Sequence, residues 1–386
     1  MIAATVELTP AESRVLDAFS DWAGLAERRP FHGWQVVAVQ HVQRSLLGLV
    51  DAVVRGGACP DDITVLGKSY STNPAVLEAL SGRGVRADDP IAMAQPQVSY
   101  EAELAGRVAA ALDTLAGRPL LVLDEGGVAR RAIAAAPHRW PQVRVVEQTA
   151  RGVRGAGMRH LTFPVIDVAR SWAKSHEEAP LIARSMHEGL MRAVADLGRR
   201  LDGWDVALVG YGVVGAALTD RLTRAGHRVT IVESEPARQD RAREAELVVA
   251  PFAEAVENQD IVIGCTGTPL FSLETAPRLA PGALLVNGGS SDIEYAVWEA
   301  RTGPDRRPWQ RHYPLPTGAD VTLVAGGFPI NFYGAVEPIP ASDFQITRGL
   351  MLAGAVQVAE SGREAGIRPL RDDLQRHIVR AYRDRI

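Results

Sequence analysis

Short, mainly apolar runs alternate along the chain with stretches in which apolar residues recur at helical spacing. The runs expected to form buried strands cover residues 34–39, 63–66, 120–123, 143–146, 206–209, 228–232, 260–264, 283–286 and 321–324. Helices are expected over about 41–54, 74–82, 183–201, 213–225 and 351–360, and over the terminal stretch 362–386. This alternation of strands and helices predicts doubly wound α/β domains with parallel sheets.

Polar residues and glycines follow directly after several of the apolar runs. They are Asp124-Glu125-Gly126-Gly127 and Glu147-Gln148-Thr149 in the first half of the chain, and Cys265-Thr266-Gly267 and Asn287-Gly288-Gly289 in the second half. The carboxyl ends of parallel strands share one edge of a sheet, and open α/β sheets bind ligands at that edge. We therefore expect a ligand-binding edge in each half of the chain.

A glycine-rich turn in the middle of the chain has the pattern of a dinucleotide-binding motif. After the run 206–209, Gly210 permits a tight turn, Gly212 lets the backbone approach a pyrophosphate, and Gly215 allows close packing of the following helix. That helix begins at Val213 and Val214, where free N–H groups can meet phosphate oxygens. The motif predicts a nicotinamide dinucleotide as cofactor.

Glu233 closes the next apolar run and indicates which dinucleotide is bound. A carboxylate there can accept hydrogen bonds from both adenosine-ribose hydroxyls and repels a 2′-phosphate, which favours NAD over NADP. Arg238, a few residues further on, is the type of residue that accommodates a 2′-phosphate. We expect NAD to be the cofactor.

Composition narrows the class of protein. The chain has 386 residues, enough for two or three domains, and a net charge of −4 gives no general attraction to nucleic acid or to an anionic membrane. Its two cysteines, Cys59 and Cys265, are too few for a disulfide framework or a zinc site. No apolar run is long enough to span a bilayer and the N-terminus lacks a basic leader, so we expect a cytoplasmic protein.

Several motifs, in their order and spacing, resemble adenosylhomocysteinase over almost the whole chain. They are Asp124-Glu-Gly-Gly127, Glu147-Gln-Thr-Ala-Arg-Gly-Val153, Ser171-Trp-Ala-Lys174-Ser175, Gly210-Tyr-Gly-Val-Val-Gly215, Cys265-Thr-Gly267 and Asn287-Gly-Gly-Ser-Ser-Asp-Ile293. The resemblance implies two Rossmann-like domains: a substrate domain over 1–185, completed by a helical segment over about 340–386, with an NAD domain inserted at 186–339. It also implies a nucleoside substrate and a homo-oligomer, dimer or tetramer, although the chain stops at residues 380–386 without the family's C-terminal extension.

The resemblance implies a chemistry in which the net reaction need not be redox. NAD⁺ oxidises the ribose 3′-hydroxyl, the ketone acidifies the C4′ proton, a leaving group departs from C5′, water adds, and the hydride returns. The catalytic residues it implies are His41, Glu125, Lys174 and Glu178. The cofactor-binding residues it implies, beside the turn, Glu233 and Arg238, are Thr149, Cys265, Thr266, Gly267, Asn287 and Gly288, and the substrate-binding residues are Ser71, Thr72, Gln148, Ser290 and Phe328.

The sequence departs from the family at positions near the sugar and the base. Gln148 replaces a glutamate, Ala179 an asparagine, and Ser290 and Phe328 stand where the family has two histidines. Specificity built on buried hydrogen bonds tolerates such losses poorly. The leading hypothesis is therefore a specialised dehydratase or lyase of the nucleoside-antibiotic type. The alternatives are an ordinary adenosylhomocysteinase and a catalytically silent NAD-binding regulator.

Overall fold

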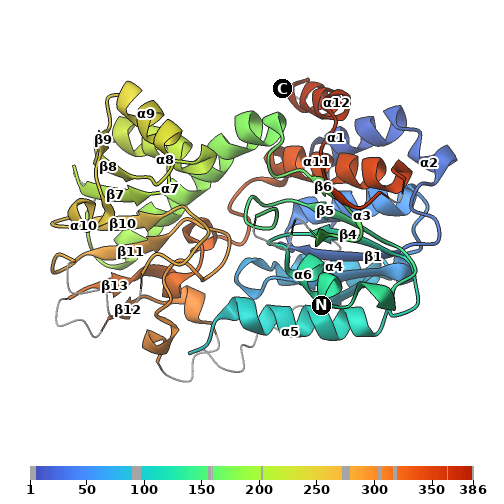
Figure 1. Ribbon diagram of the computed structural model, residues 1–386, viewed down its shortest axis with the longest axis horizontal. Helices are drawn as coiled ribbons and strands as arrows, with labels where there is room; N and C mark the ends of the chain where they lie inside the picture. The colour runs from blue at the N-terminus through green and yellow to red at the C-terminus, as the bar shows by residue number, and fades with distance from the viewer. Residues whose placement is uncertain are drawn as a thin grey trace. The chain divides into compact units, whose positions relative to one another are not determined.

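A computed structural model describes residues 6–88, 97–154, 158, 160–200, 203–271, 279–302, 307–315, 320–362 and 364–384. Within these ranges the chain forms two compact units (Figure 1). The first contains residues up to 88, 104–178 and the stretch from 339 onward, and the second contains 97–103 and 179–338. The chain therefore leaves the first unit after Glu178 and returns to it at Ile339.

The first unit is built on a parallel sheet whose described strands follow the order β14-β6-β5-β4-β1-β2-β3. Its strands are β1 (Gln35–Gln40), β2 (Ile63–Gly67), β3 (Arg86–Asp88), β4 (Leu120–Asp124), β5 (Val143–Glu147), β6 (Pro164–Asp167) and β14 (Gly366–Pro369). Every residue of β1, β4 and β5 is buried, as expected for mainly apolar parallel strands that are covered on both faces. The order of the strands reverses between β1 and β4, which makes the gap between their carboxyl ends the topological switch point.

Helices cover both faces of this sheet. They are α1 (Pro10–Trp22), α2 (Leu25–Arg28), α3 (Arg44–Arg55), α4 (Pro74–Gly82), α5 (Tyr100–Asp113), α6 (Val128–Ala135), α11 (Ala341–Glu360) and α12 (Asp372–Arg383). In Figure 1, α1, α3 and α11 lie on one side of the sheet and α5 lies on the other. Helix α5 begins in the second unit, since residues 97–103 belong there.

Helix α11 is the central helix of the first unit. It is buried on all sides, as expected for a helix that is apolar all round and enclosed by a core. Gly354 allows it to approach β5, because a Cβ at this position would lie 2.6 Å from Val146 Cγ1. The buried polar side chains of α11, among them Gln345, Thr347 and Arg348, bind groups of neighbouring elements and reach the site described below.

Several helix boundaries differ from the sequence expectation. Helix α11 starts at Ala341, ten residues before the expected 351. The sequence pattern does not predict its first turns, because the buried polar residues Gln345, Thr347 and Arg348 interrupt the run of apolar residues. The terminal stretch expected to be one helix contains β14, which pairs with β6 in parallel, and only then α12. Edge pairing with a distant strand leaves no local sequence signal, which explains this error.

The second unit contains another mainly parallel sheet, with the described strands in the order β12-β13-β11-β10-β7-β8-β9. They are β7 (Asp205–Val209), β8 (Arg228–Val232), β9 (Val248–Val249), β10 (Ile261–Gly264), β11 (Leu284–Asn287), β12 (Tyr313–Pro314) and β13 (Thr322–Leu323). Only β12 runs antiparallel to its neighbour. Its helices are α7 (Ala179–Asp196), α8 (Val213–Arg224), α9 (Pro236–Glu244) and α10 (Phe252–Ala255). Here the switch point lies between β7 and β10.

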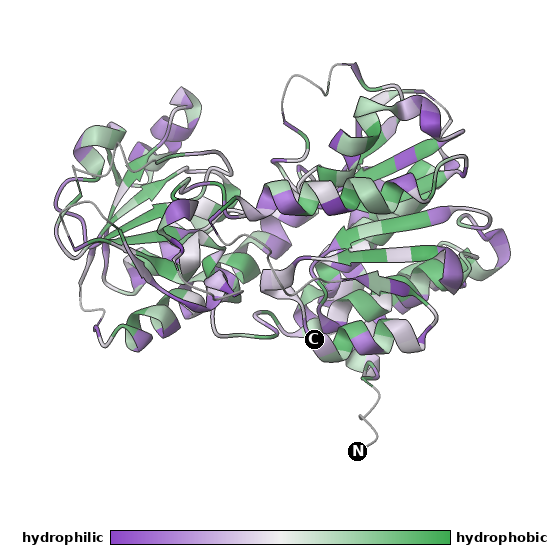
Figure 2. Cartoon of the chain, turned by 90° about the horizontal axis from the view of Figure 1, so that it is seen from below, coloured by the Kyte–Doolittle hydropathy of each residue, from purple (hydrophilic) through white to green (hydrophobic). Residues whose placement is uncertain are grey.

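Alternate residues of the strands supply two separate hydrophobic cores in the second unit. Val206 and Leu208 of β7 pack with α7 and α8, whereas Ala207 and Val209 face a cluster that includes Tyr295. Figure 2 shows the resulting pattern, with hydrophobic strands inside and helices that are hydrophilic on one side. A doubly wound sheet requires this double burial. Among the described residues, no helix is long and apolar enough to cross a membrane.

Candidate functional site

His41 and Glu125 meet at the switch point of the first unit. His41 follows β1 and Glu125 follows β4, and these two strands are hydrogen-bonded neighbours. The His41 Nε2 atom lies 2.6 Å from Glu125 Oε1, and both side chains are buried. Two of the four residues expected to be catalytic are thus brought together from positions far apart in the sequence.

Lys68 is a third charged member of this cluster, and it was not anticipated. It follows β2, the strand next to β1, and its Nζ atom lies 3.0 Å from the same Glu125 Oε1. Only 4% of the Lys68 side chain and 3% of the Glu125 side chain are exposed. Lysine is rarely buried to this extent without a paired charge. Glu125 therefore has two basic partners, His41 and Lys68, on one of its oxygens.

A composition signal could have identified Lys68. Of the 42 lysine and arginine residues in the chain, only Lys68 and Lys174 are lysines. Lysine differs from arginine in being a compact, single-point donor. Because arginine stands at nearly every other cationic position, the two lysines are candidates for roles that arginine cannot fill.

Ser71 completes the hydrogen bonding of His41. The Ser71 Oγ atom contacts His41 Nδ1 and also lies 3.0 Å from the carbonyl oxygen of Lys68. When His41 is neutral and Nε2 donates to Glu125, Nδ1 accepts the Ser71 hydroxyl proton. When His41 is protonated, Nδ1 donates to Ser71 and the hydroxyl can donate to the Lys68 carbonyl instead. Both charge states of His41 are therefore satisfied. Thr72 Oγ1 donates to the same carbonyl.

The surroundings of His41 and Glu125 favour a neutral histidine beside an ionised carboxylate. Burial lowers the pKa of His41, and this outweighs the nearby Glu125 charge, which would raise it. For Glu125, burial would raise the pKa, but the interactions with His41 and Lys68 hold it well below its usual range. From the other side, Arg348 Nη2 of α11 donates to the His41 carbonyl oxygen at 2.9 Å.

Lys174 and Glu178 form a second pair in the first unit, joined by an ion pair within one turn. Residues 174–178 form a π-helical turn directly before α7, a distortion that is often found at functional sites. Thr347 Oγ1 of α11 donates to Glu178 Oε1 at 2.5 Å, which leaves the other carboxylate oxygen to Lys174. The spacing therefore brings this pair together as the sequence predicts.

The carboxyl end of β5 holds a buried carboxyl group beneath the next loop. Glu147 Oε1 accepts from the N–H and the hydroxyl of Thr149, each at 2.7 Å, and from Gly126 N at 3.2 Å. Burial, with the adjacent Asp124 charge, raises the pKa of Glu147 to about 8. Gln148 is also buried, and its Oε1 atom has no hydrogen-bond partner among the described residues. The described contacts of Thr149 serve the loop at this edge of the first sheet.

The glycine turn of the second unit has the geometry that its sequence predicts. Gly210 has a φ of +103°, which favours glycine, and its N–H donates to Val232 O at 2.7 Å. A Cβ at Gly215 would lie 2.0 Å from Gly210 O, so only glycine lets α8 pack this close. A Cβ at Gly212 would meet only Arg238 Nη1, at 4.0 Å. The space beside Gly212, at the N-terminus of α8, therefore fits a pyrophosphate.

Glu233 is held in place by backbone donors. Its carboxylate accepts from the N–H groups of Tyr211, Ser234 and Glu235 at 2.8–3.0 Å. Burial would raise the Glu233 pKa, but these donors and the Arg238 charge lower it. Arg238 lies 3.8 Å from Glu233 Oε2 and binds Glu235 more closely, at 2.9 Å. Glu233 is thus a fixed anion after β8, the position at which a ribose is bound in this fold.

The loops after β10 and β11 are held together by a residue that the sequence analysis missed, Glu294. Its carboxyl group accepts from Gly267 N, and a Cβ at Gly264 would lie 1.8 Å from its Oε2 atom. Burial raises the pKa of Glu294 to about 7 and that of the Cys265 thiol well above its usual range. Thr266 Oγ1 lies 2.9 Å from Thr268 Oγ1.

Asn287 shapes the neighbouring loop with both ends of its amide. Its Nδ2 atom donates to Gly327 O at 2.7 Å and to Ser291 O, and its Oδ1 atom accepts from Gly289 N at 2.6 Å. A Cβ at Gly288 would lie 2.8 Å from Cys265 Sγ. Asn287 therefore positions the glycine loop through backbone groups.

Phe328 and Ser290 differ in exposure. Ser290 is partly exposed on the loop after β11. Phe328 is buried, edge-on to Tyr100 and Trp309, with the Arg301 guanidinium 4.6 Å from its ring centre. Its ring thus belongs to the core of the second unit, where Arg301 also pairs with the buried Asp292 at 3.0 Å.

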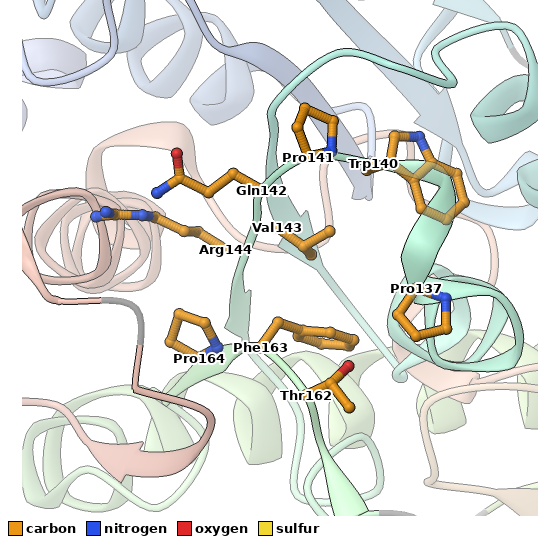
Figure 3. Close-up of a pocket in the computed structure, with 9 residues that line it drawn as sticks. All are labelled: Pro137, Trp140, Pro141, Gln142, Val143, Arg144, Thr162, Phe163 and Pro164. Carbon is orange, nitrogen blue, oxygen red and sulfur yellow. The ribbon is translucent and has the colours of Figure 1, made fainter.

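A small pocket lies away from these groups, at the amino-terminal side of β5 and β6 (Figure 3). Its volume is about 130 Å³, and its lining is mainly proline and aromatic. The one charged side chain, Arg144, donates to the carbonyl oxygens of Val358 and Ala359 and stacks over Trp34. In open α/β sheets ligands bind at the opposite edge, so we assign no catalytic role to this pocket.

Comparisons with known proteins agree with this geometry. Residues 181–336 match the family described as S-adenosyl-L-homocysteine hydrolase, NAD binding domain. The chain is 28% identical over 316 residues to an uncharacterized protein of Mycobacterium tuberculosis, covering 80% of this chain and 60% of that protein. It is 27% identical over 373 residues to S-inosyl-L-homocysteine hydrolase of Methanopyrus kandleri, covering 92% of this chain and 83% of that one.

A third relative is the adenosylhomocysteinase of Sulfurisphaera tokodaii, which is 28% identical over 323 residues. That alignment covers 80% of this chain and 74% of the relative. The chain thus spans about three fifths of the length of the Mycobacterium tuberculosis protein it matches. With the fit at Gly212 and Glu233, these findings make the second unit an NAD-binding domain and NAD the cofactor.

Proposed function

Because the chain is a divergent member of the adenosylhomocysteinase superfamily, we propose that it is an NAD-dependent enzyme acting on a nucleoside. The proposed reaction oxidises the ribose 3′-hydroxyl transiently, removes the C4′ proton and eliminates a group from C5′. The observation that carries it is the buried His41–Glu125 pair at the switch point, where both charge states of His41 find hydrogen-bond partners. A proton-transfer group needs that property.

NAD, when bound beside Gly212 and Glu233, supplies a hydride acceptor that is regenerated within the cycle. In the proposal Lys174, as the neutral amine, accepts the proton of the sugar hydroxyl, and Glu178 holds the resulting ammonium group in an ion pair. His41 transfers the proton to and from the group at C5′. Glu125 fixes the His41 tautomer by accepting from Nε2 and stabilises its protonated form.

The altered pocket residues support a specialised reaction rather than plain hydrolysis. Gln148 brings a neutral amide where the family has a carboxylate, and its Oε1 atom is buried without a partner among the described residues. Ala179, Ser290 and Phe328 remove further polar groups. These changes favour a nucleoside other than adenosylhomocysteine as the substrate. In the proposal the leaving group is water, which would make the enzyme a dehydratase.

The first test is optical. Purified protein with bound NAD is mixed with a panel of nucleosides, and reduced nicotinamide is followed by its absorbance. We expect a substrate to produce a reduced cofactor, and Lys174→Ala to slow this step by about 10²- to 10⁴-fold, the usual contribution of a proton-transfer group. Arg184→Ala, which removes a partly exposed cation of α7 that lies 3.9 Å from Glu188, is the control and should behave as wild type.

Two outcomes would contradict the proposal. If no nucleoside reduces the cofactor and Lys174→Ala changes nothing, the silent NAD-binding regulator is favoured. If adenosine and homocysteine are condensed efficiently to adenosylhomocysteine, the enzyme is an ordinary adenosylhomocysteinase, and the dehydratase part of the proposal fails.

A further inference from the structure

Lys68 is the one charged group of the buried cluster that the proposed function leaves without a role. It reaches Glu125 from the end of β2, while His41 reaches the same Oε1 atom from the end of β1. The Oε2 atom of Glu125 is also buried, yet it has no hydrogen-bond partner among the described residues. A buried carboxylate oxygen without a donor is costly, so its retention calls for an explanation.

Charge counting shows what Lys68 does to its neighbours. With Lys68 present, the anionic Glu125 is already balanced, so a second positive charge on His41 would leave the cluster with excess charge. Without Lys68, the buried carboxylate would attract a proton onto His41. Other groups around His41 in the described part of the chain include Arg348, which binds its carbonyl oxygen, the Tyr70 ring at 5.8 Å and Ser71.

The choice of lysine over arginine explains the free oxygen. An arginine at the end of β2 would present a fork of N–H donors and could occupy both oxygens of Glu125. The single ammonium group of Lys68 takes only Oε1. This distinction matters in a chain that has arginine at nearly every other cationic position.

We propose that Lys68 is a positioning residue that keeps Glu125 ionised and His41 uncharged, and that its single contact leaves Glu125 Oε2 free to accept a hydrogen bond from the substrate. The first half of this statement concerns the protein alone. The second half rests on the proposed function, because it requires a polar hydrogen of the nucleoside at Oε2.

The first experiment titrates His41 by NMR in the full chain with bound NAD and without substrate. Ring resonances of labelled histidines are followed against pH, and His41 is assigned from its absence in His41→Gln. In Lys68→Met, which keeps the length of the side chain, we expect the His41 pKa to rise by about one unit or more, because a like charge has been removed. Lys68→Arg retains the charge and should leave the His41 titration near that of wild type.

Controls separate this effect from general damage. Arg83→Met removes an arginine from the surface pair with Asp51 in the same unit and should not move the His41 titration. If Lys68→Met does not fold, Glu125→Gln is compared with the double variant Lys68→Met/Glu125→Gln. The double variant lacks the Lys68 charge and, because Glu125 is also neutralised, leaves no buried carboxylate without its partner. The double variant should titrate at higher pH. An unchanged His41 titration in a folded variant that lacks Lys68 would overturn the proposal.

The second experiment measures steady-state turnover of a nucleoside that reduces the bound cofactor, because the proton transfer at C5′ that the proposal gives to His41 is part of turnover and not of the reduction itself. In Lys68→Met the acid limb of the pH profile should move to higher pH, about tenfold in rate for each pKa unit, since protonated His41 cannot accept a proton. Lys68→Arg should keep the position of that limb but raise KM, because Oε2 is engaged. An unchanged KM in Lys68→Arg would refute the second half of the proposal, that Glu125 Oε2 is left free to accept a hydrogen bond from the substrate. If no nucleoside reacts, the proposed function fails, while the NMR result still decides the role of Lys68.

Discussion

In the first unit the switch point between β1 and β4 is occupied by charged side chains, whereas in the second unit the switch point between β7 and β10 is occupied by glycine backbone. His41, Lys68 and Glu125 gather at the first. At the second, Gly210 approaches Cys265 so closely that a Cβ would lie 2.8 Å from its carbonyl oxygen. The same topology thus brings charged side chains together at one edge and leaves room for a cofactor at the other.

This difference has an energetic side. Backbone N–H groups at a helix N-terminus bind anions without burying a formal charge. The cluster in the first unit buries several charges, which is stable only while each has its partner. We therefore expect substitutions at the glycine turn of the second unit to act mainly by steric clash. Substitutions in the cluster of the first unit should act mainly by leaving a buried charge without its partner.

The largest effect is expected at Gly215. In Gly215→Ala the new methyl group would lie 2.0 Å from Gly210 O, so the turn must open and NAD binding should be abolished. Gly212→Ala has room for its methyl group and should fold as wild type, yet lose affinity because that room belongs to the phosphates. Calorimetric titration with NAD and a thermal melt measure both variants. Tight NAD binding by Gly215→Ala would contradict the spatial explanation.

Glu125→Gln tests the charge explanation. Removing one partner of a buried pair costs roughly 3–5 kcal/mol, because Lys68 is left uncompensated. Denaturant titration followed by circular dichroism measures the loss. The matched control Glu235→Gln breaks an ion pair of the second unit whose carboxylate is half exposed, and should cost no more than about 1 kcal/mol. Equal losses in the free energy of unfolding of the two variants would show that the buried ion pair of the first unit contributes no more to stability than the half-exposed ion pair of the second.

Glu147→Gln should change how stability depends on pH. The pKa of Glu147 is raised from 4.5 to about 8, so between these values the folded chain holds a proton that the unfolded chain releases. This contribution is fully present at low pH and is lost as the pH rises from about 5 to 8. Glutamine removes that loss and should stabilise the protein at pH 8 by on the order of 3 kcal/mol.

Denaturant titrations of wild type and Glu147→Gln at pH 5.5 and pH 8 check this expectation. At pH 5.5 the two proteins should differ by on the order of 1 kcal/mol, less than at pH 8, because this pH lies only about one unit above the unfolded pKa of Glu147 and the amide oxygen can keep the Oε1 contacts. If the free energy of unfolding changed with pH equally in both proteins, Glu147 would not be the group that holds a proton in the folded chain.

The smallest effect is expected for Glu233→Gln. An amide retains one acceptor for the N–H groups of Tyr211, Ser234 and Glu235 but loses the charge that excludes a 2′-phosphate. We expect NAD affinity to fall about five- to tenfold and NADP affinity to rise. Adding Arg238→Ala should remove the gained NADP affinity. Unchanged discrimination between the two dinucleotides would show that Glu233 is not the selecting group.

The glycine turn and its carboxylate could be predicted because they are local. Gly210, Gly212 and Gly215 constrain a backbone within a few residues of themselves, and Glu233 follows the very next strand. The Lys174–Glu178 pair was predictable for the same reason, since four residues bring two side chains together on one turn. Such features depend on spacing in the chain.

Lys68, Arg348 and Glu294 could not be predicted in this way. Each acts on a residue from a distant segment: Lys68 on Glu125, Arg348 on His41, and Glu294 on Gly267. The low lysine content singles out Lys68 but does not name its partner. Strand β14 was missed because its partner β6 lies far away in the sequence.

The sequence by itself therefore determined the two α/β halves and the NAD turn, because hydrophobic periodicity and glycine placement act over short distances. Only the tertiary structure decided which charged side chains share the edge between β1 and β4. Strand order reverses there, and that reversal brings His41 and Glu125 together, while Lys68 joins them from the next strand, β2. The charge state of that cluster is a property of burial and proximity, which no stretch of the chain carries alone.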